Sequence, residues 1–412
     1  MSVSAVAALA GRLAAAEVLA EPSYRRLWLS GLCVNAARWM DLLVVGWLAL
    51  QLTGSPFMVG LAAFARAAPL MLVGPFAGIV ADRVARGRVL VAAQCVGLAT
   101  ALALAAIFGG GAGGYWPLVA LEIVFGAMWA LDFPARRTAL YAVLGASRVA
   151  QAVSLETVSM QIAKMLGPLA AGICLARVGP AAAYFLMAVV YRAGLVASAG
   201  LVARLGGPGS GPSASIVASL RAGLQAAWAS PIVRGALLVT IAMNTLFFPY
   251  QQMLPVFARD VLSVGPTALG MLVAADGVGA LVGALTLASR GGRLRHAPLF
   301  AAAVLVAPVL LMCLAGSRSF LVSMVLMVVM GAAESAFAAM QSTLVLLAAP
   351  ERVRGGAMGI LSACIGTQPL GTLAIGLLAA SVGAPLAFAT NALAALLVIG
   401  PLAVPLLRSR PG

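Results

Sequence analysis

Charged side chains stand inside long apolar stretches of this sequence, where an ionised group is costly unless it is paired or hydrated. The acids are Asp41, Glu122, Asp276 and Glu334, and the bases at similar depth are Arg38, Arg66 and Lys164. A carboxylate in such a place can bind and release a proton. Because the single histidine, His296, lies outside the apolar stretches, these four acids are the candidates for proton coupling.

Depth alone ranks Asp41 first among these acids and Glu334 second. The alternative for each acid is an ion pair that only fixes helix packing. Asp41 and Arg38 are three residues apart, so they share a helix face and could pair. Near the end of its apolar stretch, Asp132 is expected to pair with Arg136 or Arg137 for structural reasons.

Amides and aromatic rings supply the candidate substrate surface. The candidates are Asn244, Tyr250 and Gln251 near Pro249 and Pro255, with Gln368 beside Pro369, together with the three bases Arg38, Arg66 and Lys164. A helix broken at prolines can present free backbone groups to a ligand. The alternative is ordinary helix packing around a kink.

The elements that must position these residues are membrane helices. The chain has 412 residues, of which 63% are hydrophobic and 9% charged, and its mean hydropathy is +1.07. A soluble protein of this size needs a more charged surface. Apolar runs long enough to cross a bilayer recur throughout, which predicts an all-α integral membrane protein of twelve transmembrane helices. The predicted spans are 27–51, 57–81, 88–108, 116–136, 151–177, 180–203, 233–257, 267–288, 297–315, 319–341, 356–380 and 383–407.

Basic residues set the predicted orientation. Nineteen of the 26 basic residues fall on the side of the N-terminus and only three, Arg177, Arg259 and Arg318, on the other. Basic loops stay in the cytoplasm, so both termini are predicted there, in a bacterial inner membrane. This distribution also explains the formal charge of +15 without nucleic acid. Residues 1–23 do not resemble a cleaved signal peptide.

Two six-helix halves are predicted. They comprise residues 24–204 and 233–407, joined by a cytoplasmic linker, 205–232, that contains an amphipathic helix; 1–23 and 408–412 are cytoplasmic ends. Arg83-x-x-Arg86-x-Arg88 after the second span is repeated as Arg290-x-x-Arg293-x-Arg295 after the eighth. Such repeats in equivalent order indicate two pseudo-symmetric bundles.

The stretch from Gly78 to Arg88 resembles the loop signature of the major facilitator superfamily, with Asp82 and Arg83 followed by spaced arginines. The resemblance implies a gating loop, comprising Gly78, Asp82, Arg83, Arg86, Arg88, Arg136 and Arg137, that latches one of two transport states. The simpler alternative is a basic loop that only sets topology.

Further motifs are similar to the branch of that superfamily that contains the enterobactin exporter and macrolide-efflux-type proteins. They include Tyr24-Arg25-Arg26-Leu27-Trp28, Leu52-Thr53-Gly54-Ser55-Pro56 and Leu254-Pro255-Val256-Phe257. Gly167, Pro168 and Gly172 resemble the antiporter motif of drug exporters and are expected to pack helices. Ala163 and Ala171 replace two of its glycines, which weakens the antiporter inference.

No ATP site accompanies these spans, because the only lysine, Lys164, follows no glycine-rich phosphate loop. The sequence therefore predicts a secondary transporter working by alternating access, not an enzyme, with no cofactor and no metal site. Its expected partners are a small-molecule substrate, protons and the lipid bilayer, and it is expected to be a monomer. Proton-coupled drug or amphiphile efflux is the first prediction. One alternative is a dedicated exporter of an anionic metabolite such as a siderophore, because the three bases Arg38, Arg66 and Lys164 would suit an anion. The other alternative is a non-transporting sensor or scaffold.

Overall fold

The computed structural model describes residues 17–83, 85–202, 205, 224–225, 228, 230–290, 296–348 and 354–407. Within these ranges, only the backbone is described at 71–83, 146–147, 149–150, 232, 288, 290, 348, 354–355 and 405–407. Most of the N-terminal segment, most of the linker and the whole C-terminal tail that the sequence predicts therefore lie outside the described residues.

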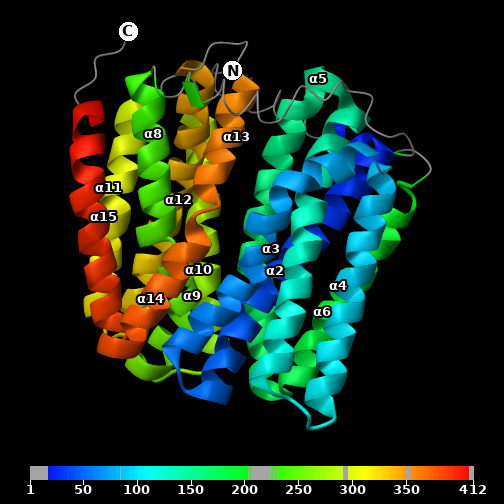
Figure 1. Cartoon of the computed structure of the whole chain (residues 1–412), viewed down its shortest axis with the longest axis horizontal. Coiled ribbons are helices and arrows are strands. Elements are labelled where there is room, and N and C mark those ends of the chain that lie inside the picture. The colour runs from blue at the N-terminus through cyan, green and yellow to red at the C-terminus, as the bar shows by residue number, and fades with distance from the viewer. Residues whose placement is uncertain are drawn as a thin grey trace, which may run out of the picture. The chain divides into compact units, whose positions relative to one another are not determined.

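All regular structure in the described part of the chain is helical (Figure 1). The first half contains α2 (Pro22–Thr53), α3 (Pro56–Arg83), α4 (Arg86–Gly109), α5 (Tyr115–Arg177) and α6 (Pro180–Ala199). The second half contains α8 (Pro231–Ala242), η1 (Met243–Phe247), α9 (Tyr250–Val256), η2 (Phe257–Val261), α10 (Pro266–Arg290), α11 (His296–Gly316), α12 (Phe320–Ala348), α13 (Arg354–Ile365), α14 (Gln368–Val382) and α15 (Ala384–Leu407).

Eleven helices among the described residues are long and apolar enough to cross a membrane, and the shorter apolar segment Pro56–Leu70 occupies the start of the second predicted span. Large apolar side chains point outward along them, including Val196, Leu321 and Leu397, each about two-thirds exposed or more. Lipid is the solvent that such surfaces require. The predicted fold, an all-α membrane protein, is confirmed.

Helix α5 differs from its prediction. The sequence predicted a span ending at residue 136 and a loop before residue 151, but the first helical segment of α5 continues from Tyr115 to Gly145, where a kink separates it from the segment that ends at Arg177. Gly145 has φ 69°, a left-handed conformation that glycine adopts without steric cost. The prediction ended where charges begin, and charges mark the edge of the bilayer, not the end of a helix.

Contacts divide the chain into two compact units. Unit 1 comprises Met1–Gly54, Ala65–Gly211 and Gly265–Ala274, and unit 2 comprises Ser55–Phe64, Pro212–Val264 and Ala275–Gly412. The first ten residues or so of α3 and of α10 thus belong to the unit opposite from the one that the sequence order suggests. In Figure 1, α4 and α6 lie side by side within unit 1, and α11 and α15 within unit 2.

Glycines allow these two short segments to pack closely. In unit 2, a Cβ added at Gly60 of α3 would lie 2.9 Å from the carbonyl oxygen of Thr372 in α14. In unit 1, a Cβ added at Gly270 of α10 would lie 2.6 Å from the carbonyl oxygen of Pro168 in α5. Both glycines stand four residues after the first proline of their helix, Pro56 or Pro266, so the two halves repeat this device.

Within unit 2, Gly331 brings α12 directly against α10. A Cβ at this position would collide with the backbone of Asp276 and lie 2.6 Å from its Oδ1 atom. By contrast, nothing lies within 4 Å of a Cβ added at Gly235 of α8. The two glycines therefore form a matched pair, one tightly packed and one open.

We expect Gly331→Ala to destabilise the protein by about 1–3 kcal/mol, because the added methyl must push α12 away from α10. Gly235→Ala should leave stability unchanged or raise it by about 0.5–1 kcal/mol, as alanine favours helix. Thermal unfolding of both variants in detergent, followed by size-exclusion chromatography, measures the difference. Equal melting temperatures for the two variants would contradict this packing.

Candidate functional site

A cluster of two acids and one base lies within unit 1. Arg66 of α3 forms an ion pair with Asp41 of α2 through Nη1, and the same nitrogen lies 4.0 Å from Oε2 of Glu122 in α5. Its Nη2 donates a hydrogen bond to the carbonyl oxygen of Arg38 at 3.2 Å. We call Asp41, Arg66 and Glu122 the charge cluster.

The local sequence explains how the charge cluster is assembled. A Cβ at Gly126 would collide with the backbone carbonyl of Arg66, so only glycine lets α5 approach α3 at this level. Glu122 stands one helical turn from Gly126 on the same face of α5, which carries its carboxylate to Arg66. A Cβ added at Gly167, also on α5, would lie 2.7 Å from the carbonyl oxygen of Ala36, so glycine at this position lets α2 pack closely against α5.

Burial makes the charges of the cluster interact strongly. The exposed fraction is 1% for Asp41 and 0% for Glu122. Neither Glu122 oxygen, nor Oδ1 of Asp41, has a hydrogen-bond partner among the described residues. A buried carboxylate with so few partners is costly when ionised, and proton binding removes that cost.

Two tryptophans contact the other two candidate bases of unit 1, Arg38 and Lys164. The Arg38 guanidinium lies 4.2 Å from the ring centroid of Trp129, and Nζ of Lys164 lies 5.0 Å from that of Trp39. Cation–π contacts of this kind attract the cation without neutralising its charge. The sequence prediction missed both rings, although a tryptophan inside a span, away from the interfacial aromatic belt, was a usable signal.

The pairing of Asp41 differs from the sequence hypothesis. Asp41 contacts Arg66, not Arg38, because Arg38 turns toward Trp129. The spacing of Arg38 and Asp41 gave a shared helix face but could not reveal a base on another helix.

In unit 2, Glu334 of α12 is buried among neutral donors. Tyr250 donates its hydroxyl to Oε1 at 2.9 Å, and Nε2 of Gln251 donates to Oε2 at 3.1 Å. The rings of Phe247, Phe248 and Phe337 continue from Tyr250 as an aromatic cluster with edge-on and tilted contacts. The site therefore combines a carboxylate with hydrogen-bond donors and an apolar wall.

The seventh span positions Tyr250 and Gln251 through irregular helix. Five-residue π-helices, η1 and η2, flank α9, with Pro249 between η1 and α9 and Pro255 inside α9. Proline removes a backbone donor, and π-turns change which face a side chain occupies. Asn244 instead donates to the carbonyl oxygen of Thr240 on its own helix at 2.9 Å.

The remaining candidates of unit 2 are Asp276 and Gln368. Asp276 is buried where Gly331 packs on α10. Gln368 is the first residue of α14, directly after the break between α13 and α14, and is partly buried. Among the described residues, no group of His, Cys, Asp and Glu has the arrangement of a metal site.

The predicted gating loop is described in part. Gly78, Asp82 and Arg83 belong to the end of α3, and their side chains lie outside the described residues. Arg86 and Arg88 form the first turn of α4. Arg137 lies 3.8 Å from Glu156, an acid that the sequence prediction missed.

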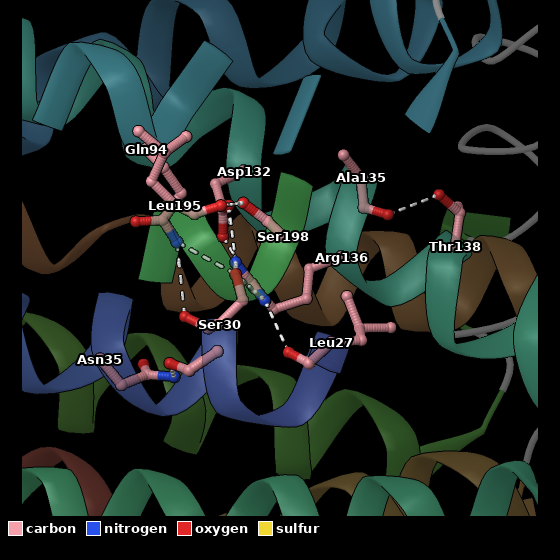
Figure 2. A network of polar contacts seen from close by, with 11 residues as sticks. Leu27, Ser30, Asn35, Gln94, Asp132, Ala135, Arg136, Thr138, Leu195 and Ser198 are labelled. Atoms are coloured by element: carbon pink, nitrogen blue, oxygen red, sulfur yellow. Dashed lines mark hydrogen bonds and ion pairs between the residues drawn. The ribbon is translucent and has the colours of Figure 1, made fainter. Parts of the chain in front are cut away.

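Arg136 occupies the centre of a polar network inside unit 1 (Figure 2). Its Nε and Nη2 atoms donate to the two oxygens of Asp132 at 2.9 and 2.8 Å, one helical turn away. Its Nη1 donates to the carbonyl oxygen of Leu27 at 3.1 Å, and Gln94 donates to the hydroxyl of Ser30 at 3.1 Å. The network ties α5 to α2 and α4, and Asp132 is the partner of Arg136 that the sequence predicted.

Comparison with known families agrees with this architecture. Residues 14–410 match a major facilitator family described as "transmembrane secretion effector". The multidrug efflux pump Tap of Mycolicibacterium fortuitum is 26% identical over 397 residues, covering 92% of this chain and 95% of Tap. Tap of Mycobacterium tuberculosis H37Rv is 27% identical over 359 residues, 84% of either chain.

Solved structures give the same fold at low identity. A POT family transporter in complex with a thioalcohol-conjugated peptide has a TM-score of 0.73 at 12% identity, covering 94% of this chain and 96% of the transporter. A bacterial homologue of the human lysosomal transporter Spinster has a TM-score of 0.71 at 14% identity, covering 94% and 97%. The nucleoside transporter NupG gives 0.71 at 14%, covering 94% and 100%.

We expect Arg136→Ala to destabilise the protein by about 3–5 kcal/mol, because it leaves Asp132 charged and buried without its partner. The double variant Asp132→Ala/Arg136→Ala should lose less than the sum of the two single variants. Melting temperatures of the four proteins in detergent complete this cycle. Strict additivity would show that the two side chains do not depend on each other.

Proposed function

Since this chain belongs to the major facilitator family of transmembrane secretion effectors, we propose that it exports small amphiphilic, drug-like molecules in exchange for protons. In this proposal the protein lies in a bacterial inner membrane with both termini in the cytoplasm, and it exports its substrate by alternating access. The likeness to Tap supports the substrate class, since Tap is a multidrug efflux pump and this chain covers nearly all of it. The basic residues on the side of the termini support the orientation.

The charge cluster is the observation that supports proton coupling in this proposal. Two buried carboxylates share the guanidinium of Arg66, and Glu122 has only a 4.0 Å contact with it. A proton on Glu122 leaves Asp41 and Arg66 as a balanced pair. Loss of that proton puts a second negative charge beside Arg66, which strengthens the attraction between α3 and α5. Proton binding can thereby change how tightly two helices hold each other, as coupled transport requires.

Vesicle transport tests the role of these acids. We expect Asp41→Asn and Glu122→Gln to slow efflux driven by a pH gradient by at least about tenfold, a barrier change of about 1.4 kcal/mol. Exchange of substrate across vesicles without a gradient should persist. Ethidium, an amphiphilic fluorescent dye, serves as the probe in inside-out vesicles, with nigericin to remove the pH gradient.

Two further variants make this test specific. Asp260→Asn changes an exposed acid that pairs with neighbouring Arg259, so its transport should equal that of the unmodified protein. Glu334→Gln removes the buried acid of unit 2, which accepts hydrogen bonds from the neutral side chains of Tyr250 and Gln251. If Glu334→Gln alone abolishes gradient-driven efflux while Asp41→Asn and Glu122→Gln retain it, the charge cluster is not the proton site.

Asp82 is proposed to latch the gating loop, as the superfamily signature implies. Asp82→Ala should slow transport several-fold, because a latch changes the rate of the conformational cycle, while dye binding to the purified protein stays within about twofold. Fluorescence anisotropy of ethidium gives the binding constant. Binding lost in proportion to transport would assign Asp82 to the substrate site instead.

An exporter of an anionic metabolite such as a siderophore is the second candidate, favoured by the positive charge of Arg38 over Trp129. Cultures of a deletion strain under iron limitation, with and without the restored gene, separate it from drug efflux. Siderophore retained in the cells and missing from the medium supports this candidate. Unchanged siderophore with raised sensitivity to drugs supports the first one.

A further inference from the structure

A groove of about 410 Å³ runs between α4 and the first part of α5, entirely within unit 1. Its walls include Ala92 and Val96 from α4 and Val124, Ala127 and Leu131 from α5, all apolar. The small alanines leave the space, and Ala92, Val96 and Val124 are exposed at its surface. Among the described residues that line it, Arg88 alone is charged.

The groove has the dimensions of part of an acyl chain. From Arg88 to Val96 is eight residues of helix, or about 12 Å along the axis, enough for roughly ten methylene groups. The wall residues belong to membrane spans, so the groove opens toward the hydrocarbon of the bilayer. An apolar chain parallel to α4 would fill it.

Positive charge gathers at one end of the groove. Arg88 is exposed in the first turn of α4 and has no acidic partner among the described residues. No side chain caps the start of this helix at Ala85, and Nε of the adjacent Arg86 is buried without a hydrogen-bond partner in the described structure. A helix N-terminus with two arginines attracts an anion such as a phosphate.

We propose that the groove binds one anionic phospholipid of the inner leaflet, with an acyl chain along Ala92 and Val96 and the phosphate at Arg88. The predicted topology puts Arg88 at the cytoplasmic surface, where lipid headgroups lie. Free phosphate would contact Arg88 but leave the apolar walls uncovered. The bound lipid would also adjoin the predicted gating loop, to which Arg88 belongs.

Native mass spectrometry of the purified full-length protein tests the site. The probes are phosphatidylglycerol and phosphatidylcholine with identical oleoyl chains, because they differ in net charge and not in tails. We expect about fivefold tighter binding of phosphatidylglycerol, the effect of one basic residue near a phosphate. Arg88→Ala should remove that preference, and Arg88→Lys should keep most of it.

A second variant tests the walls. Ala92→Leu fills the groove and should weaken binding of both lipids. Ala106→Leu, an exposed position about 21 Å further along α4, and Arg148→Ala, an exposed base outside the groove, should bind both lipids as the unmodified protein does.

Two results would overturn the proposal. Equal binding of both lipids, unaffected by Arg88→Ala, would mean that the groove takes lipid tails without regard to headgroup. A loss with Arg88→Ala but none with Ala92→Leu would place the bound lipid elsewhere. Neither readout uses transport, so the lipid site and the proposed export activity fail or succeed separately.

Discussion

The contact of Arg66 with two buried carboxylates is the interaction on which the first half of this molecule depends. Three charges at this depth are tolerable only together, since each alone would be costly in a low-dielectric interior. They come from three different helices, α2, α3 and α5. Gly126 permits the approach of α5 to α3, and Gly167 permits its approach to α2. Close backbone packing at glycines is therefore what creates the charge cluster.

Unit 2 uses the same packing device with a different chemical result. Gly331 lets α12 lie on α10, as Gly126 lets α5 lie on α3. Arg66 and Asp276 both stand ten residues after the first proline of their helices, so the repeat places a base in one half and an acid in the other. Glu334 accepts hydrogen bonds from the neutral side chains of Tyr250 and Gln251. The two halves therefore repeat the close glycine contact, whereas the charged side chains beside it differ.

Sequence patterns predicted the fold because bilayer thickness dictates the length of an apolar run, and every predicted span falls on a helix or part of one. They also predicted the Asp132–Arg136 pair, which is local, at one helical turn. The pairing of Asp41 with Arg66 could not be predicted in this way, because it joins residues 25 positions apart through tertiary packing. The same holds for Trp39 and Trp129, whose roles depend on which way two helices face.

Local irregularities of the helical backbone were the second feature that the sequence did not predict. The prolines predicted a broken seventh span, but not the two π-helices that turn Tyr250 and Gln251 toward Glu334. Hydropathy ended the fourth span at its charges, whereas the helical segment continues to the kink at Gly145. The apolar composition of a span indicates that it lies in lipid, but it says little about which backbone groups are hydrogen-bonded to each other inside the helix.

Proton release on substrate binding is the most direct test of the central claim that the charge cluster exchanges a proton for substrate. Purified protein in weakly buffered detergent solution, with a pH-indicator dye, would be mixed with ethidium at saturating concentration. The account predicts release of about one proton per bound dye, lost in Glu122→Gln and Asp41→Asn and kept in Asp260→Asn. Undiminished release from both cluster variants would contradict it.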